Sequence, residues 1–132
     1  MATFKKIEEL EIWILARKLC CLILPLTEKG KFISDIGLKQ QIKNSSGSVM
    51  DNIAEGFGRG GNKEFVNFLS FAVGSCNEVR SQLYSAFDWK YISNDEFAEC
   101  LNLSEDIISK SGGLINYLNN SEHKGEKFKN RK

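Results

Sequence analysis

The sequence of 132 residues has one proline, one histidine and almost no net charge. The low net charge and the shortage of histidine each exclude a class of protein. Eighteen basic and seventeen acidic residues leave a formal charge of +1, which excludes both a basic coat over the whole surface and a chain kept disordered by charge. The single histidine, His123, lies near the end of the chain, so the body cannot build a Ser/His/Asp or Cys/His catalytic arrangement. The composition, 42% hydrophobic, is typical of a globular domain that buries a core.

Long hydrophobic runs are also missing. The most apolar segment, residues 12–26, contains Arg17, Lys18 and Pro25 and is shorter than the roughly 20 residues that cross a bilayer. The first ten residues show no signal-peptide pattern. We therefore expect a soluble, cytoplasmic protein that does not bind a membrane.

The cysteines have no spacing that indicates a metal site. No Cys-x-x-Cys pair with a histidine partner is present, so we expect neither a metal ion nor a cofactor. In the cytoplasm the thiols should stay reduced, and we expect them to act as buried apolar side chains. They are Cys20, Cys21, Cys76 and Cys100.

Apolar residues recur at spacings of three and four in four segments, and no strand-like alternation persists for more than a few residues. This pattern predicts helices over about residues 8–24, 35–57, 62–86 and 93–118. Pro25 should end or kink the first helix, because its ring removes a backbone donor. Asp35, or Ser34 before it, can cap the second helix. Ser93 with Glu96 three residues later has the spacing of a capping box at the start of the fourth.

Four helices of similar length with short connections favour an all-α fold, an antiparallel up-down-up-down four-helix bundle. We place the bundle in residues 1–118. Residues 119–132 contain five basic and two acidic residues and little to bury, so we expect a basic disordered tail.

The first predicted helix is apolar around its whole circumference, which a helix of an isolated bundle does not need. The second and third helices carry small and aromatic residues away from their main apolar stripes. These residues either allow tight packing inside one chain or form a subunit interface that covers apolar surface. We favour the interface, with candidate residues Trp13, Ser45, Ser48, Phe71, Gly74 and Ser75.

Several ordered motifs resemble one protein family. Residues 52–59 read NIAEGFGR and resemble the NIAEGxGR signature of the bacterial four-helix-bundle proteins encoded by intervening sequences within 23S ribosomal RNA genes. Leu10, Trp13 and Ala16 match the LxxWxxA pattern that opens the family, and residues 65–78 match its FxxFLxxAxGSxxE pattern. The resemblance extends over about residues 7–118. It implies a bundle that assembles as a ring, a homopentamer, and implies little about biochemical activity.

The signature region contains a candidate polar cluster of Asn52, Glu55, Arg59 and Glu78. The first three lie at spacings of three and four, so they share a helix face, and Glu78 lies on the next helix. We favour a structural cluster that fixes the corner between the two helices, since buried ion pairs specify geometry more than they add stability. The alternative is a pair of acid/base or metal-binding carboxylates. We expect no catalytic residues and no enzymatic activity.

Four basic residues are candidate phosphate contacts, and a ring would repeat each of them several times. They are Lys39, Lys43, Arg59 and Lys63. A relative by fold, the accessory protein of diversity-generating retroelements, binds a reverse transcriptase and nucleic acid. We therefore expect a non-enzymatic oligomeric scaffold or binding module whose partner is RNA, DNA or a nucleic-acid-handling protein. The alternative is a structural or protein-interaction assembly with no nucleic-acid role.

Overall fold

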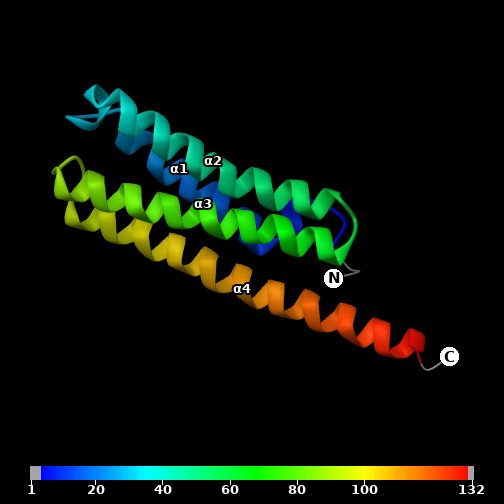
Figure 1. The fold of residues 1–132 in the computed structure, drawn as a ribbon. Coiled ribbons are helices and arrows are strands. Elements are labelled where there is room, and N and C mark those ends of the chain that lie inside the picture. The colour runs from blue at the N-terminus through cyan, green and yellow to red at the C-terminus, as the bar shows by residue number, and fades with distance from the viewer. Residues whose placement is uncertain (1–3, 131–132) are drawn as a thin grey trace.

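A computed structural model describes residues 4–130 of the chain, and the side chains of residues 4–121. Its four long helices are α1 (Glu11–Thr27), α2 (Ile36–Gly58), α3 (Asn62–Asp88) and α4 (Asn94–Asn130). Two short 3-10 helices, η1 (Ile7–Glu9) and η2 (Phe32–Ser34), precede α1 and α2. Figure 1 shows the four long helices packed side by side in one bundle, and the described residues contain no strand. The predicted all-α fold of four helices is confirmed.

One hydrophobic core runs through the bundle, because each helix turns one apolar stripe inward. Each fully buried large apolar side chain contributes about 1.5–3 kcal/mol of stability relative to an exposed one. The fully buried side chains of this core include Leu19, Ile23, Ile42, Val49, Ile53, Leu69, Cys76, Val79, Leu83, Ile107 and Leu118. Two ion pairs tie α4 to the start of α1 and to the loop after it: Lys110 Nζ lies 2.7 Å from Glu11 Oε1, and Lys29 Nζ lies 2.6 Å from Glu96 Oε2.

Helix α1 does not end at its proline. It continues through Thr27, two residues past Pro25. The helix therefore ends near Pro25, as predicted. It passes the proline because Pro25 lies in the last turn and is exposed, so its missing N–H removes one hydrogen bond and interrupts little packing. The Thr27 hydroxyl donates to the Leu24 carbonyl at 2.8 Å and closes the final turn.

The start of α2 is tied to the far end of α3 through one carboxylate. Asp35 caps α2 as predicted, since its Oδ1 accepts the Leu38 N–H at 3.0 Å. Its Oδ2 accepts the Tyr91 hydroxyl at 2.9 Å. The Tyr91 ring also lies 5.4 Å from the ring of Phe32. This hydrogen bond to Asp35 raises the pKa of the Tyr91 hydroxyl above its ordinary value.

The turn between α3 and α4 depends on one residue with an unusual backbone conformation. Trp89 is the C-cap of α3, and Lys90 after it adopts the left-handed conformation with φ of 63°. The Lys90 N–H then donates to Phe87 and the Tyr91 N–H to Ala86, the pattern of a Schellman motif. The predicted capping box follows: Glu96 N–H donates to Ser93 Oγ at 3.1 Å, and Ser93 N–H donates to Glu96 Oε1 at 2.9 Å.

Helix α4 passes Gly112 and Gly113 without interruption and extends beyond the other helices in Figure 1. Its backbone is helical through Asn130. The basic disordered tail expected over residues 119–132 remains a prediction. A helix that has already formed adds one hydrogen bond for each residue it orders, which favours continuation. The bundle boundary at residue 118 remains a prediction. Residues 1–3 and 131–132, and the side chains after residue 121, lie outside what the structure describes.

The cysteines divide into two kinds. Cys76 and Cys100 are buried as expected, and burial raises the pKa of the Cys76 thiol to about 12 and that of Cys100 to about 11. Cys20 is half-buried, and Cys21 is exposed on the outer side of α1, so the prediction that all four are interior was wrong for Cys21. Cys20 and Cys21 directly follow Leu19, which is fully buried. Because successive residues of a helix are about 100° apart, Cys21 lies on the side of α1 that faces away from the core.

Candidate functional site

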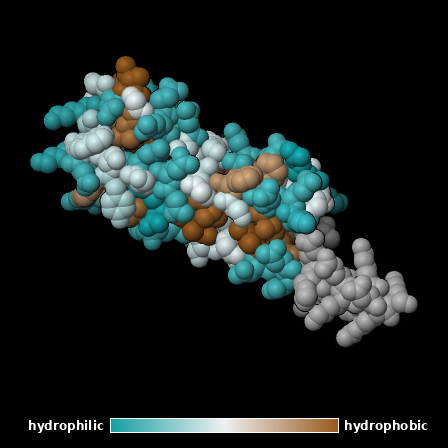
Figure 2. All heavy atoms as spheres, viewed as in Figure 1, coloured by the Kyte–Doolittle hydropathy of each residue, from teal (hydrophilic) through white to brown (hydrophobic). Residues whose placement is uncertain are grey.

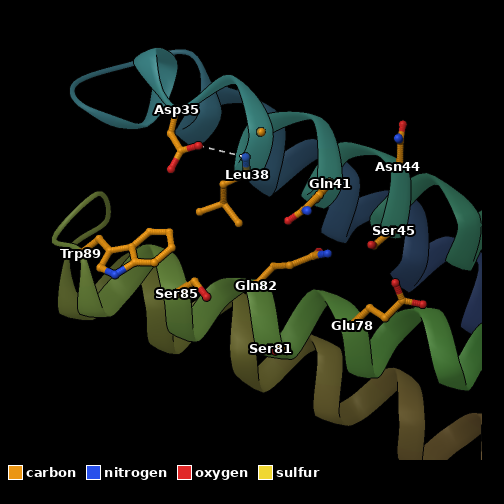
Figure 3. A pocket seen from close by; sticks show the side chains of 11 residues that line it. Asp35, Leu38, Gln41, Asn44, Ser45, Glu78, Ser81, Gln82, Ser85 and Trp89 are labelled. Carbon is orange, nitrogen blue, oxygen red and sulfur yellow. Dashed lines mark hydrogen bonds between the residues drawn. The ribbon is translucent and has the colours of Figure 1, made fainter.

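A polar groove lies between α2 and α3 on the outside of the bundle. Its volume is about 600 Å³. Figure 3 shows Gln41 and Ser45 from α2 facing Glu78 and Gln82 from α3, with Trp89 near one end. The remaining lining residues are Asp35, Gly37, Leu38, Asn44, Ser81 and Ser85. No lysine or arginine is among the lining residues that the structure describes, and the charged side chains that line the groove are the carboxylates of Asp35 and Glu78.

The two carboxylates of the groove differ in availability. Both oxygens of Asp35 already accept a hydrogen bond, one from Leu38 and one from Tyr91. Glu78 is exposed, and no ion pair to it is found within residues 4–121. The Gln82 Oε1 atom is buried and has no hydrogen-bond partner among the described atoms. The groove therefore presents one free carboxylate beside one unsatisfied carbonyl oxygen.

The structure divides the predicted polar cluster into separate contacts. Arg59 Nε donates to Glu55 Oε2 at 2.9 Å, both side chains are about half-exposed, and the Arg59 guanidinium lies 5.1 Å from the Phe68 ring centroid. Asn52 instead donates to the carbonyl and hydroxyl of Ser48, each at 2.9 Å.

Glu78 lies away from these contacts. Ser48 Oγ and Ser75 Oγ are 2.9 Å apart, which sets the register between α2 and α3. From that level Glu55 and Glu78 extend in opposite directions, by seven and three residues, so they lie about 15 Å apart along the helices at about 1.5 Å per residue. The two carboxylates therefore do not converge on one reacting atom.

The predicted interface residues fall into two groups. Ser45 is buried, and the Ser48–Ser75 hydrogen bond joins α2 to α3 inside one chain, as tight packing within a chain requires. Trp13 is half-buried against the core. Gly74 and Phe71 face outward, and 52% of Phe71 is exposed. The interface assignment stays a prediction, and Phe71 and Gly74 are the members with most free surface.

The predicted phosphate contacts also differ. Lys39 Nζ lies 3.0 Å from Glu28 Oε1, and Arg59 pairs with Glu55, so both charges are partly neutralised. Lys43 and Lys63 are exposed, and no ion pair to either is found within the described residues. The basic side chains after residue 121 lie outside the described part.

A second, more apolar pocket of about 580 Å³ lies at the glycine corner between α2 and α3. Its walls include Phe4, Phe57, Phe65 and Tyr117. No three His, Cys, Asp or Glu side chains within the described residues are placed to hold a metal ion. No helix of the described part is long and apolar enough to cross a membrane.

Comparison with protein families decides the family. The model of the 23S rRNA-intervening sequence protein family matches residues 8–113. The chain belongs to this family. The match covers most of the bundle, including the NIAEGFGR signature and the outer face of α3, and confirms the resemblance seen in the motifs.

A solved structure shows that the family fold is shared at low identity. This family member is similar to the crystal structure of a protein of unknown function from the S23 ribosomal protein family of Bacteroides thetaiotaomicron, with a TM-score of 0.71 and 19% identity. The similarity covers 79% of this chain and 97% of that chain. At this identity it shows the fold alone. No curated protein matches the chain.

The groove was not predicted as a site. Trp89, 55% exposed, lies at the end of the groove. A signal was present, because Phe71, Ser75, Glu78, Gln82 and Trp89 follow the spacing of one helix face. Which residues of α2 lie opposite this face depends on the register between the two helices, which the Ser48–Ser75 contact sets.

Proposed function

We propose that this family member is a non-enzymatic homo-oligomeric scaffold or binding module whose subunits close into a ring, most simply a pentamer. The proposal includes an antiparallel up-down-up-down order of the helices. The ion pairs support this order, because Glu11 at the start of α1 pairs with Lys110 far along α4, and Lys29 after α1 pairs with Glu96 at the start of α4.

The observation that carries the proposal is exposed apolar surface on two helices. Exposed fractions are 48% for Ile14, 45% for Leu24 and 52% for Phe71. Figure 2 shows hydrophobic surface gathered in distinct patches on the viewed face. Patches of this kind are common at subunit contacts, because association removes apolar area from water.

Sedimentation velocity at low micromolar concentration tests the assembly. We expect one species with a mass several times the 14.9 kDa of the chain, and five times that mass for a pentamer. A single well-behaved species of 14.9 kDa at that concentration would contradict the proposal.

We further propose that the assembly binds nucleic acid, or a protein that handles it, in the cytoplasm. Support comes from the exposed Lys43 and Lys63, which a ring would repeat around its axis. We expect structured RNA to be retarded in electrophoresis, with affinity that falls steeply between low and physiological salt. The double variant Lys43→Glu/Lys63→Glu should weaken binding and reduce the salt slope.

The single variants Lys43→Gln and Lys63→Gln should each weaken binding, and Lys110→Gln is their matched control, because it also removes one positive charge but at a lysine that pairs with Glu11. An intact ring that shows no retardation at low salt would favour the alternative, a structural or protein-interaction assembly with no nucleic-acid role.

A further inference from the structure

The chemistry of the α2–α3 groove fits a cation. Two acceptors stand out among its polar groups: the Glu78 carboxylate and the buried, unpartnered Gln82 Oε1 lie on the same helix, one turn apart. Leaving a buried carbonyl oxygen unsatisfied is unfavourable, and a donor that reaches it removes that cost. A guanidinium suits this pair of acceptors, because it combines positive charge with several N–H donors in a planar fork.

Apolar side chains flank this acceptor site along α3. Phe71 is 52% exposed on one side of Glu78, and Trp89 is 55% exposed on the other. The indole of Trp89 lines the end of the groove in Figure 3. A ligand that fits the whole face therefore has a cation between two apolar groups.

The outer face of α1 has this composition. Ile14, Arg17, Cys21 and Leu24 follow at spacings of three, four and three, and all four are exposed. They lie opposite the buried stripe of Ile12, Ala16, Leu19 and Ile23. No ion pair to Arg17 is found within residues 4–121. Arg17 is thus an available guanidinium between two exposed aliphatic side chains.

The two faces belong to different sides of one chain. The α1 stripe points away from the bundle, and Figure 1 shows α1 behind α2 and α3. Arg17 therefore cannot enter the groove of its own chain. Two different, complementary faces on one protomer make a heterologous contact, the kind that closes cyclic rings.

We propose that the α2–α3 groove of one protomer receives Arg17 from a second copy of this chain, with the guanidinium bound by Glu78 and Gln82. Leu24 follows Arg17 by seven residues, as Trp89 follows Gln82, so Leu24 of the entering helix covers the exposed indole of Trp89. Ile14, three residues before Arg17, packs against α3 on the side of Glu78 that leads to Phe71. This inference rests on the proposed oligomer and names the contact that builds it.

Charge exchange tests the pairing, with the dissociation constant of the oligomer measured by sedimentation velocity over a concentration series. Glu78→Arg and Arg17→Glu should each raise that constant by at least about tenfold, about 1.4 kcal/mol. The double variant Glu78→Arg/Arg17→Glu should return it to within about threefold of the unmodified chain, because the pair is restored with reversed charges. Asp106→Arg, an exposed charge change on α4, is the control and should have no effect.

Each result has a distinct meaning. If the unmodified chain is monomeric, the proposed function and this inference both fail. If it is oligomeric and neither single variant weakens it, the inference fails while the oligomer stands. If both singles weaken it but the exchange restores nothing, the residues do not contact each other and the pairing is overturned. Should a charge reversal unfold the chain, as far-UV circular dichroism would reveal, Glu78→Gln and Arg17→Gln replace it and should each weaken assembly.

Discussion

The two ends of the bundle are held together by different kinds of contact. At the corner between α2 and α3 the backbone of Gly56 packs directly against Phe68 and Phe65 of α3, which leave no room for a side chain at this position. At the opposite end, polar side chains join the connections: Asp35 binds Tyr91, and Lys29 binds Glu96. We therefore expect the first end to be sensitive to volume, and the second to charge and hydrogen bonding.

Replacing Gly56 should have the largest effect. A Cβ at this position would lie 2.7 Å from Phe68 Cβ and 3.1 Å from Phe65 Cδ1. We expect Gly56→Ala to lower the free energy of unfolding by about 1–3 kcal/mol, as overpacking usually does. Urea denaturation measures this change.

Gly47→Ala is the matched control in the same helix, because a Cβ there meets nothing within 4 Å. It should raise the free energy of unfolding by up to about 1 kcal/mol, since alanine is the better helix former. Equal effects of the two variants would show that the glycine corner is not limited by volume.

At the polar end, Asp35→Ala should lower the free energy of unfolding by about 1–2 kcal/mol, because it removes the cap of α2 and the acceptor of the Tyr91 hydroxyl together. Tyr91→Phe removes the single hydrogen bond to Asp35 and should destabilise less. Thermal unfolding of both variants and of the double variant measures their coupling. If the two variants change the stability additively, the Asp35–Tyr91 hydrogen bond does not contribute to holding the two connections together.

The smallest effect should depend on pH. Lys29, followed by the Ser93 N–H, lowers the pKa of the Glu96 carboxyl below its ordinary value. The ionised form therefore stabilises the fold above the ordinary pKa of the carboxyl, and this contribution is lost as the pH falls through the lowered pKa.

Glu96→Gln should lower the free energy of unfolding by about 0.5–1 kcal/mol at neutral pH, as expected for a partly exposed ion pair whose carboxylate also belongs to a capping box. In acid, this difference in unfolding free energy from the unmodified chain should shrink towards zero. Urea denaturation at pH 7 and at about pH 3 makes the comparison. A difference independent of pH would assign the effect to packing rather than charge.

Contacts between neighbours in sequence could be predicted, and contacts between helices could not. The Ser93–Glu96 capping box and the Glu55–Arg59 pair depend on spacings of three and four within one helix, and both formed as the spacing indicates. Glu78 was placed with Glu55 because the register between α2 and α3 was unknown. The bond from Tyr91 to Asp35 joins residues 56 positions apart, which no local pattern predicts.

The groove illustrates the same limit. The residues of α3 that line it share a face that can be read from spacing, but the unsatisfied oxygen of Gln82 depends on which α2 side chains lie opposite.

The left-handed backbone at Lys90 has a consequence for recognition. Two main-chain hydrogen bonds of the Schellman turn, together with the bond from Trp89 N–H to the Ser85 carbonyl, hold the segment that carries the exposed indole. The backbone of Trp89 is therefore already ordered before a partner binds, and little backbone conformational entropy of this segment is lost on association. The end of the groove is preorganised before anything binds.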